Sequence, residues 1–428
     1  MLDMKRIREN PDAIRAGITR KNEKDRLDEV LALDLRRRTI IGEVEGLKSR
    51  RNTVSQEIAR LKKAKEDADT LIAEMKGVSD RIAELDTELR DTESGIDDLV
   101  LYIPNMPHES VPVGSSAADN VEVRRWVPEG TVGLNAETPA PVLDHIELGK
   151  KHAMLDFERG TKLSGSGFPL YTGKGATLER ALINFMLDLH LAEHGYTEVF
   201  PPFVVNAASM RGTGQLPKMS DDMYRCVDED LYLIPTAEVP LTNIYRDEVL
   251  QGAQLPIKFC GYSACFRREA GSYGKETKGF LRVHQFNKVE MVKFTAPETS
   301  YDELESLVAD AEDILQKLNV PYRVLLLCTG DMSFASAKTY DIEVWSPGEN
   351  KWLEASSCSC FEDFQARRAM IRFKRDAQSK PEFVHTLNGS GLATSRLMVA
   401  LLENNQQADG TIRVPEVLRR YTGFESIG

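Results

Sequence analysis

The chain has 428 residues, more than one compact core usually holds, so we expect at least two domains. Its 41% hydrophobic and 29% charged residues are typical of a soluble globular protein and exclude wholesale disorder. A formal net charge of −12 excludes a globally basic nucleic-acid binder but allows a local basic patch. Residues 1–15 carry charges where a secretory signal needs an apolar stretch, and no apolar run approaches the roughly 18 residues of a membrane span. We therefore expect a cytoplasmic protein with no membrane partner.

Residues 27–100 carry the clearest pattern in the chain. Apolar residues alternate steps of three and four in two runs, which the polar stretch 62–69 separates. A repeat of seven keeps one narrow seam toward a partner helix, which predicts an antiparallel helical hairpin with a coiled-coil seam. At about 1.5 Å per residue its arms reach roughly 45–57 Å, longer than a small domain is wide, so we expect it to extend into solvent. The seam positions are Ile40, Val44, Leu47, Val54, Ile58 and Leu61, then Leu71, Met75, Val78, Ile82, Leu85, Leu89, Thr92, Ile96 and Leu99.

The charge of this predicted hairpin is uneven. Between residues 48 and 65, seven basic residues minus one acid give +6, and between 80 and 98, two basic residues minus eight acids give −6. Charges beyond about 8–10 Å are screened at cellular salt, so a nearby partner meets the basic strip and not the net charge. A phosphate backbone fits such a strip, and a merely solvated helix face is the alternative. The basic residues are Lys48, Arg50, Arg51, Arg60, Lys62, Lys63 and Lys65.

The segment 104–120 is rich in Pro, Gly and Ser and cannot continue a helix, which predicts a linker between an N-terminal domain, 1–103, and a second domain, 121–428. Strands and helices do not alternate regularly in the second domain, so we expect a mixed α+β fold. The expected helices are 178–194, 299–318 and 362–375, and the expected strand-rich segments are 197–205, 288–294 and 321–328.

Several familiar signatures are absent. The dipeptide Gly274–Lys275 lacks the flanking residues of a phosphate-binding P-loop, and the glycines of 165–175 miss the dinucleotide fingerprint and predict a hairpin instead. There is no Gly-x-Ser-x-Gly elbow, the histidines are dispersed, and the six cysteines show no Cys-x-x-Cys spacing. A serine hydrolase and a structural zinc site are therefore disfavoured, and we expect the cysteines to be reduced thiols.

The segment 266–292 carries residue types that suit a nucleotide. Two β-like arms flank a Gly- and Lys-rich loop, with Arg267 and Glu269 entering it and Phe286 and Glu290 leaving it. An arginine mounted on a sheet suits a polyphosphate, and a nearby aromatic ring suits a stacked base. An ordinary packed hairpin is the alternative.

Two later segments complete the set. The first, 352–368, holds Glu354 and Ser357, a carboxylate and a hydroxyl that can form half of a Mg²⁺ shell. The second, 387–406, leads from a turn of small residues into an apolar helix that carries Arg396 near its start. Taken singly, the first has an exposed strand edge as its alternative, and the second a buried helix with one salt bridge.

In this order the segments resemble the signature motifs of class II aminoacyl-tRNA synthetases. Motif 1 would be the helix 178–194 and the following strand with Pro202, motif 2 the Arg267 hairpin and motif 3 the Arg396 helix. More narrowly, the whole chain resembles the bacterial seryl-tRNA synthetase family, and its N-terminal hairpin resembles that family's tRNA-binding arm. The segments that carry this resemblance are TGQLPKM, LIPTAEVPLTN, FRREAGSYG, VHQFNKVEMV, LCTGDMSFASAKTYDIEVW, FQARR, HTLNGSGLA and ADGTIRVPEVLRRY.

The resemblance implies a fold and an activity. The fold would be a long antiparallel helical hairpin followed by a class II catalytic domain, built on an antiparallel sheet flanked by helices. The activity would be ATP-dependent attachment of L-serine to tRNA(Ser) through seryl-adenylate, and serylation of tRNA(Sec) where the organism has one, by a homodimer that uses Mg²⁺. The rivals are a synthetase-like ligase that loads a carrier protein, which the long arm disfavours, and a non-catalytic RNA-binding homologue, which the retained motif residues disfavour.

Residue roles follow from the matched motifs. Arg267 and Arg396 would be the catalytic arginines: Arg267 would hold the α-phosphate and the serine carboxylate, and Arg396 with Phe286 would sandwich the adenine, whose edge Glu269 would read. The implied ATP-binding set is Arg267, Arg268, Glu269, Val283, Phe286, Glu354, Ala355, Ser356, Ser357 and Arg396, with Glu354 and Ser357 as the metal ligands. The implied serine-binding set is Thr236, Ala237, Glu238, Arg267, Glu290 and Ser390. The implied tRNA-binding set is Lys48, Arg50, Arg51, Arg60, Lys62, Lys63 and Lys65.

The chemistry agrees with these roles. Attack of a carboxylate on a phosphoryl centre needs positioning and charge neutralisation more than a catalytic histidine. If Glu290 accepts a hydrogen bond from the serine hydroxyl, alanine would leave that carboxylate unpaired, and such sites discriminate by up to roughly 10⁴–10⁵-fold. The chain departs from the family pattern at Ser395, usually Gly, at Ala355, usually Ile, and at Arg268, commonly Ser; none of these changes removes a contacting side chain.

Overall fold

The computed structural model describes residues 1–131, 133–134, 142–270 and 278–428, which form two compact units. The first unit comprises Met1–Thr19 and Glu23–Pro104, and the second comprises Arg20–Asn22 and Asn105–Gly428. Almost all of the segment predicted as a linker groups with the second unit, where it forms the short 3-10 helix η1 (Ala117–Asp119). Across the described ranges, no helix combines the length and the apolar character that crossing a membrane requires.

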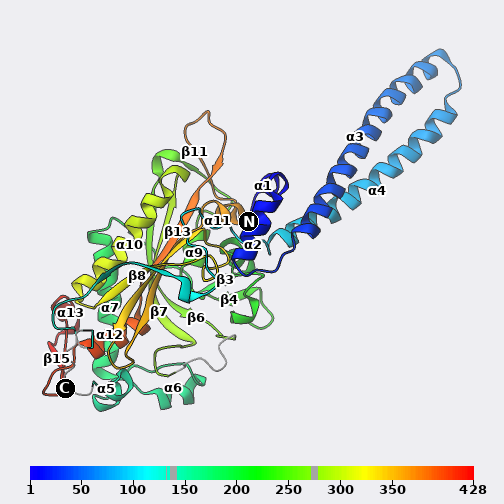
Figure 1. Ribbon diagram of the computed structural model, residues 1–428. Helices are drawn as coiled ribbons and strands as arrows, with labels where there is room; N and C mark the ends of the chain where they lie inside the picture. The colour runs from blue at the N-terminus through cyan, green and yellow to red at the C-terminus, as the bar shows by residue number, and fades with distance from the viewer. Residues whose placement is uncertain (132, 135–141, 271–277) are drawn as a thin grey trace. The chain divides into compact units, whose positions relative to one another are not determined.

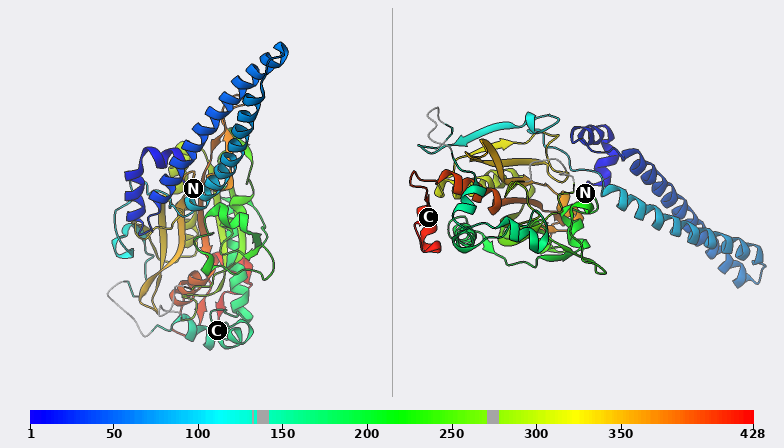
Figure 2. Two further views of the ribbon diagram at one scale, coloured as in Figure 1. Left: turned by 90° about the vertical axis from the view of Figure 1, so that its right-hand side faces the viewer. Right: turned by 90° about the horizontal axis from the view of Figure 1, so that it is seen from below.

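The first unit contains the predicted hairpin. Its helices are α1 (Met4–Glu9), α2 (Pro11–Arg20), α3 (Leu27–Ala64) and α4 (Asp69–Val100), the last two running side by side and antiparallel (Figures 1 and 2). The turn between them begins at Lys65, whose left-handed backbone (φ 59°) lets its N–H donate to the carbonyl oxygens of Leu61 and Lys62. Every predicted seam position is buried or half-buried, so the predicted coiled-coil hairpin is confirmed.

One charged residue interrupts the apolar seam near the base of α3. Asp34 is only 1% exposed, and its carboxylate lies 3.3 Å from Arg8 of α1 and 3.0 and 3.2 Å from Arg37 and Arg38 of its own helix. A buried carboxylate is tolerated only when cations and hydrogen bonds replace its hydration. Asp34 therefore ties α1 to α3 within the first unit.

The second unit is built on an eight-stranded sheet with the order β1-β8-β9-β10-β13-β7-β6-β2 (Figure 1). All neighbours in it are antiparallel except β2 and β6, which confirms the predicted α+β class and antiparallel platform. Its strands are β1 (Val121–Trp126), β2 (Thr197–Glu198), β6 (Ile257–Phe266), β7 (Gln285–Thr295), β8 (Tyr322–Leu326), β9 (Lys338–Ser346), β10 (Lys351–Cys360) and β13 (His385–Ala393). The smaller sheets contain β3 (Val204–Asn206) with β4 (Leu231–Leu233), β5 (Val249–Gln251) with β11 (Arg372–Lys374) and β12 (Glu382–Phe383), and β14 (Ile412–Arg413) with β15 (Ser426–Ile427).

Helices cover both faces of this sheet, and β7 shows how one strand serves both. Val289 and Met291 point into the larger core, which includes residues of α7, α10 and α12, whereas Val292 and Phe294 point into a smaller core with α9 and α11. Successive side chains of a strand alternate between faces, so Glu290 belongs to the second face. The helices of the unit are α5 (His145–Lys151), α6 (Phe157–Ser164), α7 (Gly173–Ala192), α8 (Ala207–Thr213), α9 (Glu238–Asn243), α10 (Ser300–Lys317), α11 (Phe364–Ala369), α12 (Thr394–Asn404) and α13 (Glu416–Thr422), with 3-10 turns η2 (Ser220–Asp222), η3 (Gly252–Gln254) and η4 (Pro297–Thr299).

Two local predictions are wrong. The helix expected over 362–375 ends at Ala369, because Met370 adopts a left-handed backbone (φ 55°) and the next residues pair with β5 as strand β11. The glycines of 165–175 form no hairpin: Gly165 ends α6, and Gly173 begins α7. The Gly- and Lys-rich loop with Gly274–Lys275 lies outside the described residues.

The strand-rich segment 197–205 yields only two short strands, β2 and the start of β3, which belong to different sheets. Pro201 and Pro202 lie between them, and proline has no N–H for a strand ladder. All six cysteines are free thiols, and five of them are buried.

Candidate functional site

The hairpin of β6 and β7 carries the arginine that the sequence singled out. Arg267 follows directly on β6, and its N–H donates to the carbonyl oxygen of His284 at 2.9 Å, which continues the ladder by one residue. Its Nε donates to the carbonyl oxygen of Pro235 at 3.3 Å, and its guanidinium carbon lies 5.1 Å from the centroid of the Phe286 ring. Two strands and a loop thus hold one cation beside one aromatic face, an arrangement that suits a phosphate next to a stacked base.

The residues that follow Arg267 leave the sheet. Arg268 is exposed, and its N–H donates to the carbonyl oxygen of Asp222 at 2.9 Å. Glu269 has a positive φ of 52° and forms an ion pair with Arg282, a residue that sequence reasoning missed. Val283, predicted for the ATP site, is buried at 5% exposure. The backbone therefore turns Glu269 away from the strand direction, and Arg282 fixes its carboxylate.

A β-bulge in β10 explains the spacing of the two predicted metal ligands. Glu354 and Ser357 are three residues apart, so in a regular strand they would lie on opposite faces. The register with β9 shifts between residues 354 and 356, which leaves Ala355 as the extra residue. Glu354 then pairs with Glu343, and Ser357 with Asp341, two residues that share one face of β9. The bulge thus places the carboxylate and the hydroxyl on the same side of the sheet.

Asp341 adds a second carboxyl group to this side. Burial and the nearby charge of Glu354 raise the pKa of Asp341 well above its usual range, although the Ser357 hydroxyl donates to it. Its Oδ1 is buried and has no hydrogen-bond partner among the described atoms. A cation would relieve both the repulsion and the unpaired oxygen, so the group fits Mg²⁺, which binds one or two carboxylates and takes its remaining ligands from water and phosphates. Within the described residues, no cluster of three or more His, Cys, Asp and Glu is arranged as a metal site by itself.

Arg396 reaches the same strand from α12. Its Nη1 donates to the backbone carbonyl oxygen of Glu354 at 2.8 Å and lies 3.3 Å from a carboxylate oxygen of the same residue. Its Nε donates to the carbonyl oxygen of Leu281 at 3.2 Å. On the other face of β10, the Ser356 hydroxyl donates to the carbonyl oxygen of Ser390 at 2.6 Å. The predicted residues of the 352–368 and 387–406 segments are therefore in direct contact.

The residues predicted to bind the substrate serine form a second group, on the face of β7 that α9 covers. Glu290 is fully buried, and Ser390 lies directly opposite it on β13. The Thr236 hydroxyl donates to Glu290 at 3.2 Å, and the Asn388 amide donates at 2.7 Å. Lys288, also buried, forms an ion pair with Glu290. Lys288 and Asn388 were not predicted from the sequence.

Glu238 begins α9 in the same group. It is 7% exposed, and burial, reinforced by the charge of Glu290, raises its pKa to about 7. Gln365 of the FQARR segment donates to Glu238 at 2.6 Å, and the oxygen of the same amide accepts from the Thr386 hydroxyl at 2.7 Å. Ala237, which precedes Glu238, is fully buried. Gln365 thus fixes the position of a carboxyl group that can bind a positively charged group of a ligand.

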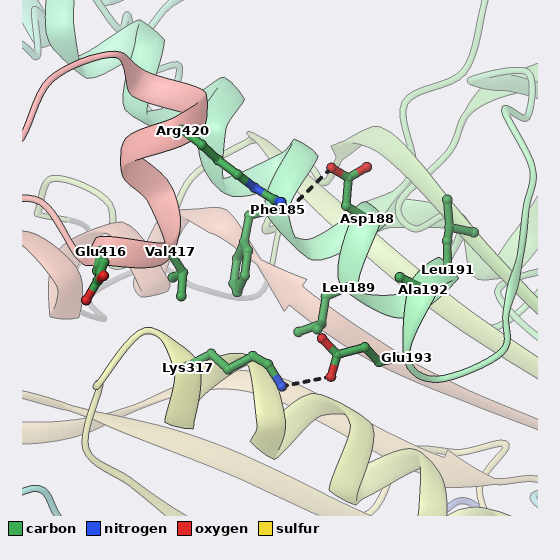
Figure 3. Close-up of a pocket in the computed structure, with 10 residues that line it drawn as sticks. All are labelled: Phe185, Asp188, Leu189, Leu191, Ala192, Glu193, Lys317, Glu416, Val417 and Arg420. Atoms are coloured by element: carbon green, nitrogen blue, oxygen red, sulfur yellow. Dashed lines mark hydrogen bonds and ion pairs between the residues drawn. The ribbon is translucent and has the colours of Figure 1, made fainter.

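A cavity of about 760 Å³ lies elsewhere, between α7, the end of α10 and α13 (Figure 3). Figure 3 shows ion pairs at its rim, between Asp188 and Arg420 and between Glu193 and Lys317. None of the predicted site residues lines this cavity. It is therefore separate from both groups described above.

The basic strip of α3 is only partly neutralised by acids of the first unit. Arg50 forms an ion pair with Glu74, and Lys48 and Arg60 lie 3.8 and 2.9 Å from Asp86 and Glu57. Ion pairs within the unit are absent for the other four residues, all of which the structure describes. They are Arg51, Lys62, Lys63 and Lys65. These four cations remain available to an anionic partner.

Comparison with known families and structures assigns the chain to a class and then to a family. The model described as tRNA synthetase class II core domain (G, H, P, S and T) matches residues 223–405, which contain the Arg267 hairpin, the β10 bulge and Arg396. The second unit therefore carries a class II synthetase core. The model described as Seryl-tRNA synthetase N-terminal domain matches residues 1–107, which contain the helical hairpin.

Full-length relatives agree with both models. The chain is 63% identical to the serine--tRNA ligase of Chloroherpeton thalassium and 58% identical to that of Chlorobaculum parvum, with 100% of each chain covered. The crystal structure of seryl-tRNA synthetase from Pyrococcus horikoshii complexed with ATP superposes with a TM-score of 0.95 at 41% identity, over 100% of this chain and 99% of that one. The chain belongs to the seryl-tRNA synthetase family of class II aminoacyl-tRNA synthetases.

Proposed function

We propose that the protein attaches L-serine to tRNA(Ser) in two steps, with ATP as the energy source and seryl-adenylate as the intermediate. The observation that carries this proposal is that Arg267 directly after β6, Glu290 on β7 and Glu354 on β10 belong to one antiparallel platform. Thr236 contacts Glu290, and Arg396 contacts Glu354. The family membership, and the name of the Pyrococcus horikoshii structure with ATP, support the same activity.

In the first step the serine carboxylate attacks the α-phosphorus of ATP, a new O–P bond forms, and pyrophosphate leaves. Arg267 supplies positive charge where the α-phosphate and the serine carboxylate meet, which offsets the repulsion between two anions. Phe286 and Arg396 hold the adenine between an aromatic face and a guanidinium, while Glu269 reads its edge. A Mg²⁺ ion on Glu354 and Ser357 would neutralise phosphate charge when bound.

Serine recognition falls to the second group of residues. Glu290 accepts the hydrogen bond of the substrate hydroxyl, with Ser390 beside it, while Glu238 takes the ammonium group and Thr236 holds Glu290 through a hydrogen bond. Alanine would leave a buried carboxylate short of a donor, and this type of site rejects the analogue by up to roughly 10⁴–10⁵-fold. Threonine is excluded by lack of space for its extra methyl group.

In the second step a hydroxyl of the terminal adenosine of tRNA takes the seryl group, and AMP leaves. The helical arm, residues 1–103, binds tRNA through its basic strip, the segment 104–120 links it to the catalytic domain, 121–428, and motif 1 pairs two such domains in a homodimer. The same reaction extends to tRNA(Sec) where that tRNA exists. We place this work in the cytoplasm.

Serine-dependent ATP–pyrophosphate exchange tests the proposal, run in parallel with threonine, alanine and glycine. We expect exchange with serine alone, together with transfer of labelled serine to tRNA. Exchange followed by transfer to a carrier protein and not to tRNA would favour a carrier-loading ligase. Absence of exchange with every amino acid, in a protein that still binds tRNA, would favour the non-catalytic homologue.

A further inference from the structure

A buried lysine stands beside the carboxylate of the proposed serine pocket. Lys288 and Glu290 are two residues apart on β7, so both side chains point to the same face of the sheet. They form an ion pair, and their residues are 5% and 0% exposed. The Lys288 ammonium also donates to the Thr236 hydroxyl at 2.8 Å. Removal of a cation and an anion from water is costly, so a pair of this kind at a binding site calls for a functional explanation.

The hydrogen bonds of Glu290 can be counted. A carboxylate accepts about four hydrogen bonds, two at each oxygen. Its Oε2 accepts from Thr236 and lies against the Lys288 ammonium, while its Oε1 accepts from Asn388 at 2.7 Å. One acceptor position therefore remains, and it lies on Oε1. That position matches the single O–H donor that a serine hydroxyl offers.

Every hydrogen-bonding position of the Thr236 hydroxyl is occupied in this arrangement. Its oxygen receives the Lys288 ammonium and the N–H of Glu238, at 2.8 and 3.1 Å, and its one proton goes to Glu290. A hydroxyl has one donor and two acceptor positions, all of which are in use. Lys288 thus fixes the direction of the Thr236 proton as well as the position of the Glu290 carboxylate.

We propose that Lys288 is a positioning residue for serine selection: it holds the Glu290 carboxylate and the Thr236 hydroxyl in place, with one acceptor position of Glu290 left for the hydroxyl of the substrate. The inference rests on the proposed function and adds the residue that sets its substrate preference. Lys288 itself need not contact serine, because it acts through Glu290 and Thr236.

The charged groups around this pair are few. Glu238 lies on α9, and Arg267 follows β6 nearby. One thiol of β6, Cys265, lies on the same face of the sheet as the pair, and burial raises its pKa, so it stays neutral. Lys288 is therefore the buried cation in direct contact with Glu290.

The test is a pair of substitutions, Lys288→Met and Lys288→Arg, in the full-length protein. Without the ammonium, Glu290 and Thr236 each lose a partner that holds them in place, so we expect the KM for serine of K288M to rise by about 10- to 100-fold. The KM for ATP should change little. K288R keeps a cation and hydrogen-bond donors, so its KM for serine should lie closer to that of the wild type.

A matched control lies on the same strand. Lys293 is fully buried and pairs with Glu303 at 2.9 Å, but its side chain points to the opposite face of β7. K293M therefore removes a buried cation without touching the serine group, and its KM for serine should stay close to that of the wild type. Lys288→Gln, which keeps a donor but no charge, replaces K288M if that variant does not fold; we expect a rise in the KM for serine and little change in the KM for ATP.

The possible outcomes distinguish a failure of the inference about Lys288 from a failure of the proposed function. A folded K288M or K288Q with the wild-type KM for serine overturns the positioning role, as does an equal rise of the serine KM in K293M. Wild-type protein without serine-dependent exchange would instead contradict the proposed function itself. A ratio of serine to alanine use that falls in K288M but not in K293M supports the inference.

Discussion

Charged side chains are placed differently in the helical hairpin and in the catalytic unit. On the hairpin, pairs such as Arg36 with Glu88 and Arg81 with Glu43 are about 40% exposed on both partners. In the catalytic unit, Lys288 and Glu290 are almost wholly buried, and Arg267 is held between a backbone carbonyl and an aromatic ring. Exposed pairs contribute roughly 0–1 kcal/mol, whereas a broken buried pair costs about 3–5 kcal/mol.

The difference teaches where each unit is sensitive to substitution. The hairpin is stabilised by a long apolar seam, so its surface charges are free to serve a partner. The catalytic unit uses its charges to hold one another at fixed positions, so a single substitution disturbs several contacts. Asp34 is the exception in the hairpin, since it is buried and surrounded by arginines.

The largest effect is expected from Arg267→Ala. Loss of the cation at the α-phosphate should lower serine-dependent ATP–pyrophosphate exchange by at least about 10³-fold, because one preorganised donor is worth about 10²–10³-fold and Arg267 has two roles. Arg125→Ala is the control, an exposed arginine on β1 that pairs with Glu122. Near-normal exchange in folded R267A would discard the role assigned to Arg267.

Deletion of residues 44–93 separates the two units by function. Exchange should stay within about twofold of the wild type, because the arm does not take part in adenylate formation, while serylation of tRNA should fall by at least about 10²-fold as the basic strip is lost. Steady-state charging and exchange assays on the same preparation check this. Equal loss of both half-reactions would contradict the division of labour.

A smaller effect is expected from pH. Burial raises the pKa of Glu238 to about 7, and the proposed function has its ionised form bind the serine ammonium. Below pH 7 the carboxyl group is increasingly protonated, so the KM for serine should fall about tenfold as the pH rises from 6 to 8. In Glu238→Gln the KM should be high and independent of pH over this range. A flat profile in the wild type would show that Glu238 does not control binding.

The smallest effect is expected on the surface of the hairpin. Arg36→Ala should change the free energy of unfolding by less than about 1 kcal/mol, because both partners of the pair are exposed. Asp34→Ala should cost more, about 2 kcal/mol, since it removes the buried carboxylate to which Arg8, Arg37 and Arg38 bind. Urea denaturation of both variants measures the difference. Equal losses would remove the distinction drawn between exposed and buried pairs.

The sequence predicted the hairpin well because its physics is local. Each seam residue depends on neighbours three or four positions away, so a periodic pattern reveals both the helix and its buried side. The catalytic platform was reached by another route, the resemblance of its motifs to a family. Without the resemblance, the irregular order of strands and helices predicted only the α+β class of this unit. The predicted helix 362–375 extended beyond the end of α11, because the left-handed turn at Met370 has no signature in the surrounding residues.

Contacts between site residues from distant segments could not be predicted from the sequence. Asn388 contacts Glu290 from 98 residues away, and Gln365 contacts Glu238 from 127, so neither contact is visible before strand register is known. Lys288 could have been found, since its spacing of two from Glu290 on a predicted strand puts both on one face. Asp341 could not, because its place beside Ser357 depends on a bulge that breaks the regular alternation of β10.

The same bulge in β10 determines whether replacements or changes of length are tolerated at position 355 during evolution. Ala355 is buried at 2% exposure and pairs with no residue of β9, so its main contribution is one extra residue in the strand. The length of the strand therefore matters most here. Loss of one residue would restore regular pleating and send Glu354 and Ser357 to opposite sides of the sheet. Insertions and deletions in this short stretch should therefore be purged far more strictly than replacements.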